Sequence, residues 1–183
     1  MKKNTFIQLR KKIIEKHFNR MNDSQLEAVF SAEGPLLVLA GAGSGKTTVI
    51  VNRIANLVKF GNAYSSEEIQ SVPTENDLLE MQQYLAGELS DISEIGCAMD
   101  INAVKPWNIL AITFTNKAAN ELKERLQTML GDDAKDIWAS TFHSSCARIL
   151  RSHASLLGYS SNYTIYDTDD SKRTMKECQR ILG

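Results

Sequence analysis

The stretch that decides the fold is Ala40-Gly41-Ala42-Gly43-Ser44-Gly45-Lys46-Thr47, which follows a short apolar run and precedes a helical pattern. Glycines let the backbone curl until successive N–H groups point inward and can cradle a phosphate. The N-terminus of the following helix adds partial positive charge. A glycine-rich turn that arose by chance would lack this strand–loop–helix context. The stretch therefore predicts a phosphate loop.

The side chains of the loop predict a nucleotide and a magnesium ion as ligands. Lys46 can neutralise β- and γ-phosphate oxygens, and the Thr47 hydroxyl can ligate Mg²⁺. Lys46 and Thr47 are therefore the predicted catalytic residues, and Thr47 is the predicted metal ligand. Ala40 stands where the strict pattern has glycine. The predicted nucleotide-binding residues of the loop are Ala40, Gly41, Ala42, Gly43, Ser44, Gly45, Lys46, Thr47 and Thr48.

Outside the loop, short apolar runs alternate with helical patterns. Residues 36–40 are continuously apolar, as expected of a strand buried on both faces. Residues 109–113 and 137–141 repeat this pattern, and residues 163–166 form a weaker fourth run. Helices are predicted over residues 4–19 and 22–31, after the loop to about Phe60, after the strands at 109–113 and 137–141, and from about Thr168. Such alternation predicts an α/β fold with a parallel sheet and right-handed crossovers.

The predicted helices have apolar stripes or marked starts. The first has the stripe Phe6, Leu9, Ile13 and His17, with Arg10 among the basic residues around it. The helices after the second and third strands have the stripes Ala119, Leu122, Leu126, Met129 and Phe142, Cys146, Ile149, His153, Leu157. The helix over 22–31 starts at Asn22 or Asp23. Asp167 follows too few apolar residues for a magnesium-binding carboxylate, so we predict a helix N-cap there.

Residues 62–105 interrupt the alternation and predict a mainly helical insert. Residues 62–104 contain nine acids and no Lys or Arg, which leaves a net charge of +8 on the rest of the chain. Thr74-x-x-Asp77 is typical of a capping box. The stripe Leu78, Met81, Leu85 and Leu89 must then cover the parent domain or meet a protein partner. We expect replacement of residues 63–104 by a short linker to leave a folded domain.

Composition excludes several classes of protein. The chain is 43% apolar, enough for a core, and no run of about 18 apolar residues predicts a membrane span. The basic N-terminus is not followed by an apolar stretch, so it is no secretory signal. Cys97, Cys146 and Cys178 are widely spaced, which indicates reduced thiols and a cytoplasmic protein.

Five stretches in order resemble the opening motifs of superfamily 1 DNA helicases of the UvrD/PcrA/Rep type. Besides the phosphate loop, they are residues 21–29, 112–122, 139–144 and 164–170 (MNDSQLEAV, ITFTNKAANEL, ASTFHS and TIYDTDD). The likeness covers residues 15–61 and 106–182. It implies a RecA-like domain of an ATP-driven 3′-to-5′ translocase on single-stranded DNA, with ATP and Mg²⁺ as cofactors and a second RecA-like domain elsewhere in the chain.

The resemblance assigns further site residues. Gln25 matches a glutamine that contacts adenine, and a Gln amide can pair with adenine N7 and N6, although spacing alone indicates an exposed helix residue. Phe114 could stack on a base, whereas Phe142 could stack or pack in the core. The predicted DNA-binding residues are Thr113, Phe114, Thr115, Asn116, Lys117, Thr141, Phe142, His143, Ser144 and Arg148.

Some features of the family pattern are missing. No Asp-Glu dipeptide occurs, so the DExx motif with its magnesium acid and water-activating Glu is absent. Thr48 stands where many relatives have Arg, and the insert is longer than the usual link. We expect residues 1–61 and 106–183 to form the N-terminal part of the ATP-binding domain, which is incomplete and catalytically inactive alone.

Two other classes remain open. A small phosphotransferase would need a lid with arginines and a second phosphate-binding element. A protein- or DNA-binding scaffold would have an inert phosphate loop and an acidic insert that docks a protein.

Overall fold

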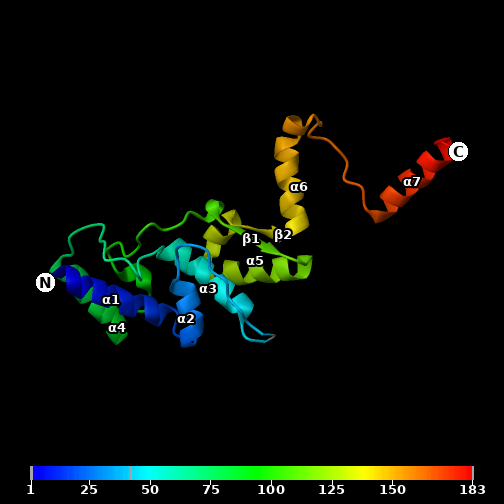
Figure 1. Cartoon of the computed structure of the whole chain (residues 1–183). Coiled ribbons are helices and arrows are strands. Elements are labelled where there is room, and N and C mark those ends of the chain that lie inside the picture. The colour runs from blue at the N-terminus through cyan, green and yellow to red at the C-terminus, as the bar shows by residue number, and fades with distance from the viewer. Residues whose placement is uncertain (1, 42, 183) are drawn as a thin grey trace. The chain divides into compact units, whose positions relative to one another are not determined.

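The computed structural model describes residues 2–41 and 43–182, which fall into two compact units, residues 1–140 and residues 141–183. The first unit contains α1 (Lys2–His17), α2 (Asp23–Phe30), α3 (Lys46–Lys59), α4 (Glu75–Ala86), β1 (Leu110–Thr113), α5 (Asn116–Leu130) and most of β2 (Trp138–Thr141), with short 3₁₀ turns between them (Figure 1). The second contains α6 (Phe142–His153) and α7 (Thr168–Leu182). Ala42, a predicted nucleotide-binding residue, lies outside the described residues.

The sheet of the described residues is short and parallel, with β1 beside β2. These strands confirm the predictions for residues 109–113 and 137–141. Ala111, Ile137 and Ala139 are buried against Leu122 and Leu126 of α5 and Val51 and Ile54 of α3. The apolar stripe of α5 therefore covers the sheet as its 3.6-residue spacing requires. The mixed α/β class is confirmed and is compatible with part of a RecA-like domain.

Two predicted strands are wrong. Residues 36–40 are in no strand, and Leu37 and Leu39 are 82% and 88% exposed. A continuously apolar strand is stable only between neighbouring strands and under helices on both faces. Within the described residues, β1 and β2 pair only with each other, so residues 36–40 have no neighbouring strand. Residues 163–166 are also in no strand, and Ile165 and Tyr166 are exposed.

A second core lies where α1, α2 and α3 meet. Phe18 and Phe30 pack edge-on there, with Val29 and Phe60 buried beside them. The start of α2 is decided by Asn22, whose side chain accepts a hydrogen bond from the Gln25 N–H. Asn22 and not Asp23 is therefore the N-cap, which satisfies one of the backbone donors that every helix start leaves unpaired.

The segment 62–105 packs along α1. The predicted capping box is confirmed, because the Thr74 hydroxyl accepts from the Asp77 N–H and Asp77 accepts from the Thr74 N–H. Met81 of α4 is fully buried in a cluster with Phe6 and Ile13 of α1, and Leu78, Leu85 and Leu89 adjoin it. Of the two alternatives for this stripe, the structure therefore has it covering the parent unit (Figure 1).

Arg10 is buried, although the sequence places it among the basic residues around the apolar stripe of α1. Its side chain is fully buried, and it donates to the carbonyl oxygens of Glu68 at 2.8 Å and Ser66 at 2.5 Å. Burial lowers its pKa below the ordinary value. Two carbonyls of segment 62–105 are thus satisfied by a cationic side chain of α1.

The segment leaves and returns at one point. Gly61 forms a parallel bridge with Ile101, and the Ile101 N–H donates to the Phe60 carbonyl at 3.1 Å. Gly61 has a φ of 61°, and a Cβ there would lie 2.1 Å from the Ile101 carbonyl oxygen. Only glycine permits this close approach of two backbones.

In the second unit, α6 has one buried residue, Ser145, and the predicted stripe is not a core. Phe142 is 57% exposed, and Ile149 and Leu157 are also exposed. The stripe has too few neighbours within residues 141–182 to be covered. Asp167 accepts hydrogen bonds from the N–H groups of Asp169 and Asp170, both at 2.8 Å, which confirms it as the N-cap of α7. No helix among the described residues has the length and apolarity needed to cross a membrane.

Candidate nucleotide and DNA site

The predicted phosphate loop leads directly into α3. Gly43 and Gly45 have φ values of 77° and 84°, in the left-handed region that glycine adopts without strain. Gly45 is the N-cap of α3, and no side chain caps the first turn. The N–H groups of that turn are therefore placed to receive an anion, together with the positive end of the helix dipole.

Lys46 is folded over its own loop. Its Nζ donates to the carbonyl oxygens of Ala40 at 3.1 Å and Gly41 at 2.5 Å, and the Ser44 hydroxyl also donates to Gly41. The predicted contact of Lys46 with phosphate oxygens requires the ammonium to leave these carbonyls. A phosphate is the stronger acceptor, because it carries a full negative charge.

Gln25 has a second role that the sequence analysis missed. Its Oε1 accepts from the Asn22 N–H at 3.1 Å, which completes a capping box, and its Nε2 donates to the Ser44 carbonyl at 3.2 Å. Gln25 thus joins the start of α2 to the phosphate loop. The spacing Asn22-x-x-Gln25 carried the signal for the capping box.

One cavity, of about 570 Å³, brings Gln25 together with part of the phosphate loop and is called the loop cavity below. It is lined by Gln25, Ala40, Gly41, Ser44 and Lys46, with apolar walls from residues such as Val38 and Ile50. A lysine, an uncapped helix start beside the cavity and an apolar wall suit a nucleotide with Mg²⁺. Thr48 does not line this cavity and belongs to another, on the far side of α3.

The predicted DNA-binding residues of the first unit lie at the turn from β1 to α5. Phe114 is 98% exposed, and Asn116 and Lys117 beside it are also exposed. Thr115 is the N-cap of α5 and accepts from the Ala118 N–H at 3.2 Å, and the Thr113 hydroxyl donates to the Thr115 carbonyl. An aromatic ring beside a helix N-terminus and a lysine suits a base and its phosphate.

A similar turn starts the second unit. Thr141 is the N-cap of α6, and its hydroxyl accepts from the Ser144 N–H at 3.2 Å. Phe142 and His143 are exposed and lie edge-on to each other, with ring centroids 6.3 Å apart. Arg148 is exposed one to two turns further along α6. Phe142 is therefore not packed in a core within the described residues, and its ring is exposed to solvent.

Residues 21–85 and 92–181 match the family described as the UvrD/REP helicase N-terminal domain. The chain belongs to this family.

Relatives in the UvrD/Rep family are similar over most of the chain. The ATP-dependent DNA helicase PcrA of Staphylococcus aureus strain Mu50 is 43% identical over 159 residues, which are 87% of this chain. PcrA of Leuconostoc citreum is 42% identical over 164 residues, 89% of this chain, and PcrA of Staphylococcus epidermidis is 41% identical over 157 residues, 86% of this chain. The chain spans 16% of the length of each of these relatives.

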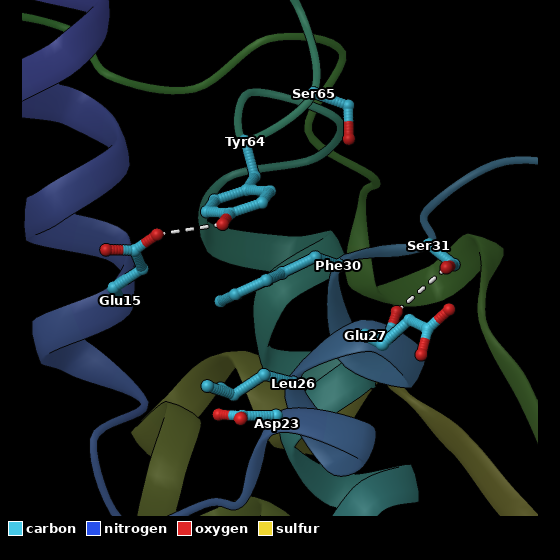
Figure 2. A pocket seen from close by; sticks show the side chains of 8 residues that line it. All are labelled: Glu15, Asp23, Leu26, Glu27, Phe30, Ser31, Tyr64 and Ser65. Carbon is cyan, nitrogen blue, oxygen red and sulfur yellow. Dashed lines mark hydrogen bonds between the residues drawn. The ribbon is translucent and has the colours of Figure 1, made fainter.

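Another cavity in this UvrD/Rep-family chain, of about 640 Å³, is unsuited to a nucleotide. Figure 2 shows its walls, with Glu15 of α1 facing Tyr64, and Asp23 and Glu27 on α2. These carboxylates repel a polyphosphate. The Tyr64 hydroxyl donates to Glu15 Oε1 at 2.8 Å, and burial together with this carboxylate raises the pKa of Tyr64 to about 12.

Proposed function

We propose that the chain is the N-terminal ATP- and single-stranded-DNA-binding part of an ATP-dependent 3′-to-5′ DNA helicase. The observation that carries this proposal is the match to the UvrD/REP helicase N-terminal domain along residues 21–85 and 92–181. The geometry of the phosphate loop supports it, because Gln25, Ser44 and Lys46 share one cavity. The relatives' name, ATP-dependent DNA helicase, supports the nucleotide and the substrate.

For the nucleotide, we assign ATP with Mg²⁺ to the loop cavity. The triphosphate would take the N–H groups of residues 43–48 and the ammonium of Lys46, and Thr47 would ligate the metal. Gln25 would pair with adenine through the second N–H of its amide and the second lone pair of Oε1, since its bonds to Ser44 and Asn22 use only one of each.

For the DNA, we assign single-strand contacts to each of the two polar turns, each considered within its own unit. Phe114 and Phe142 would stack on bases, and Lys117, His143 and Arg148 would hold phosphates. The helix starts at Asn116 and Ser144 would add backbone N–H donors.

Turnover would need groups outside these residues. ATP hydrolysis requires a magnesium carboxylate, a water-activating acid and an arginine at the γ-phosphate. In the proposed whole protein, a DExx motif and a second RecA-like domain would supply them. We therefore assign binding, not hydrolysis, to this chain alone.

The test is titration calorimetry of the 183-residue chain with ATP and Mg²⁺. Lys46→Ala should weaken binding by about 1.5–3 kcal/mol, the contribution of a charged hydrogen-bonding group. Lys123→Ala is the matched control, because Lys123 is an exposed lysine on α5 outside the loop cavity. Equal binding by Lys46→Ala and Lys123→Ala would mean that ATP sits elsewhere.

A further inference from the structure

A cavity of about 670 Å³ lies on the side of α3 opposite the loop cavity. The α3 residues that line it are Thr48, Val51, Asn52 and Lys59, whereas those that line the loop cavity are Lys46, Val49, Ile50 and Arg53. At 3.6 residues per turn, these two sets face opposite sides of the helix. The cavities share no lining residue, so they are separate places within the unit of residues 1–140.

The cavity is rimmed by basic side chains. His17, Arg20, Lys59 and Arg125 line it, and none of its lining residues is an acid. Burial and the nearby Lys59 lower the pKa of His17, so the charge comes from the other three. Arg125 is paired with Glu121 at 2.7 Å, whereas Arg20 and Lys59 are in no ion pair among the described residues.

One acid outside the cavity faces this rim. Hydrogen bonds from Ser93 chiefly lower the pKa of Asp91, and Lys59 and His17 contribute through their charges. Asp91 is fully exposed and forms no salt bridge with Lys59 among the described residues. The rim therefore keeps a positive field, in contrast to the carboxylates of the cavity in Figure 2.

The floor of the cavity is apolar. Phe18, Met21 and Val51 are buried, and Met129 adjoins them. Asn19, Asn52 and Thr128 add amide and hydroxyl groups to the lining. An apolar floor and a basic rim together suit a ligand with an apolar body and a negative group.

We propose that this cavity binds a nucleoside phosphate, with the base on the apolar floor and the phosphate at Arg20 and Lys59. The ligand is a free nucleotide or one nucleotide unit of a nucleic acid strand, since both present the same chemistry. This site is additional to the phosphate loop and does not depend on ATP binding there.

The test uses the 183-residue chain with Lys46→Ala, which weakens binding at the loop. Thymidine 5′-monophosphate and a short oligothymidylate are titrated separately, with amide chemical shifts of Asn52 and Thr128 as the readout. Both residues line the cavity. Adding Arg20→Glu or Lys59→Gln should weaken binding about tenfold or more, equivalent to about 1.4 kcal/mol. Adding Lys123→Glu, an exposed lysine outside the cavity, should leave it unchanged.

The two probes separate the sources of the ligand. Much tighter binding of the oligonucleotide assigns the site to a nucleic acid strand, and similar affinities assign it to free nucleotides. Inorganic phosphate that binds as well as the monophosphate overturns the role of the floor. Equal losses in Arg20→Glu and Lys123→Glu, or unmoved Asn52 and Thr128 amides, overturn the site. Because Lys46 is already replaced, failure of ATP binding at the loop is a different result.

Discussion

Gly45 has a backbone conformation that other residues adopt only at a cost. Its φ is 84°, and an added Cβ would lie 2.9 Å from Gln25 Nε2. Gly45→Ala should therefore lose about 1–2 kcal/mol of unfolding free energy and also displace Gln25 from the Ser44 carbonyl. We expect ATP binding to weaken, as measured by titration calorimetry at a temperature where the variant is folded.

The matched control is Gly87→Ala. Gly87 has a φ of 88° at the end of α4, and an added Cβ would meet nothing within 4 Å. Denaturation should show a comparable loss of stability, but ATP binding should not change. If both variants bind ATP like the parent chain, the contact between Gly45 and Gln25 has no part in nucleotide binding.

The raised pKa of Tyr64 predicts that the folded chain loses stability at alkaline pH. Its pKa is 10.0 ordinarily and about 12 in the folded chain, because burial and Glu15 disfavour the phenolate. The folded state therefore holds the proton more tightly. This contribution to stability is complete below pH 10.0 and is lost as the pH rises through about 12.

Tyr64→Phe should remove the part of the alkaline loss in unfolding free energy that comes from Tyr64. We would measure urea unfolding from neutral pH to pH 12 and compare the fall in unfolding free energy above pH 10.0. Tyr159→Phe is the control, since Tyr159 is 66% exposed. If the unfolding free energy of Tyr64→Phe falls with pH as steeply as that of Tyr159→Phe, the Tyr64–Glu15 hydrogen bond does not control the alkaline transition.

At the scale of elements, the packing of α4 on α1 makes the segment 62–105 part of the core. Met81 is fully buried against Phe6 and Ile13, whereas Leu79 on the same helix is 50% exposed. Met81→Ala should cost about 2–5 kcal/mol of unfolding free energy through lost burial and the cavity left behind. Leu79→Ala should cost much less, and chemical denaturation measures both. Similar small losses would mean that α4 is not held against α1.

The same contacts change one expectation from the sequence. Replacement of residues 63–104 by a linker would expose Phe6 and Ile13 and leave buried Arg10 without the Ser66 and Glu68 carbonyls. A buried cation without partners is costly. The linker variant should therefore be destabilised and not simply lose an appendage.

At the scale of the whole molecule, the charge distribution favours a polyanion outside the acidic segment. All 21 Lys and Arg residues lie outside residues 62–104. Lys117→Ala should lower the slope of log K against log salt for single-stranded DNA by about one. Phe114→Ala should weaken binding by about 1–3 kcal/mol with little change in slope, because stacking releases few counterions.

Fluorescence anisotropy with a labelled oligothymidylate at several salt concentrations measures both quantities. Lys123→Ala is the control on the same helix as Lys117. An equal change of slope in Phe114→Ala and Lys117→Ala would contradict the assignment of stacking to one residue and phosphate contact to the other.

The sequence by itself determined the helices, β1 and β2, and the caps at Thr74 and Asp167, because these depend on residues within a few positions of each other. It also determined the family, since ordered short patterns need no tertiary information. The strands predicted at 36–40 and 163–166 failed because apolar periodicity does not reveal whether a partner strand is present.

Only the tertiary structure decided which polar groups are buried and which distant residues meet. In the sequence, Arg10 is one of several basic residues around an apolar stripe. In the structure, it donates hydrogen bonds to carbonyls 56 and 58 residues later. Gln25 contacts a loop carbonyl 19 residues away, and the basic cavity collects residues from α1, α3 and α5. Burial and long-range hydrogen bonds depend on how elements pack, and local sequence patterns do not encode that packing.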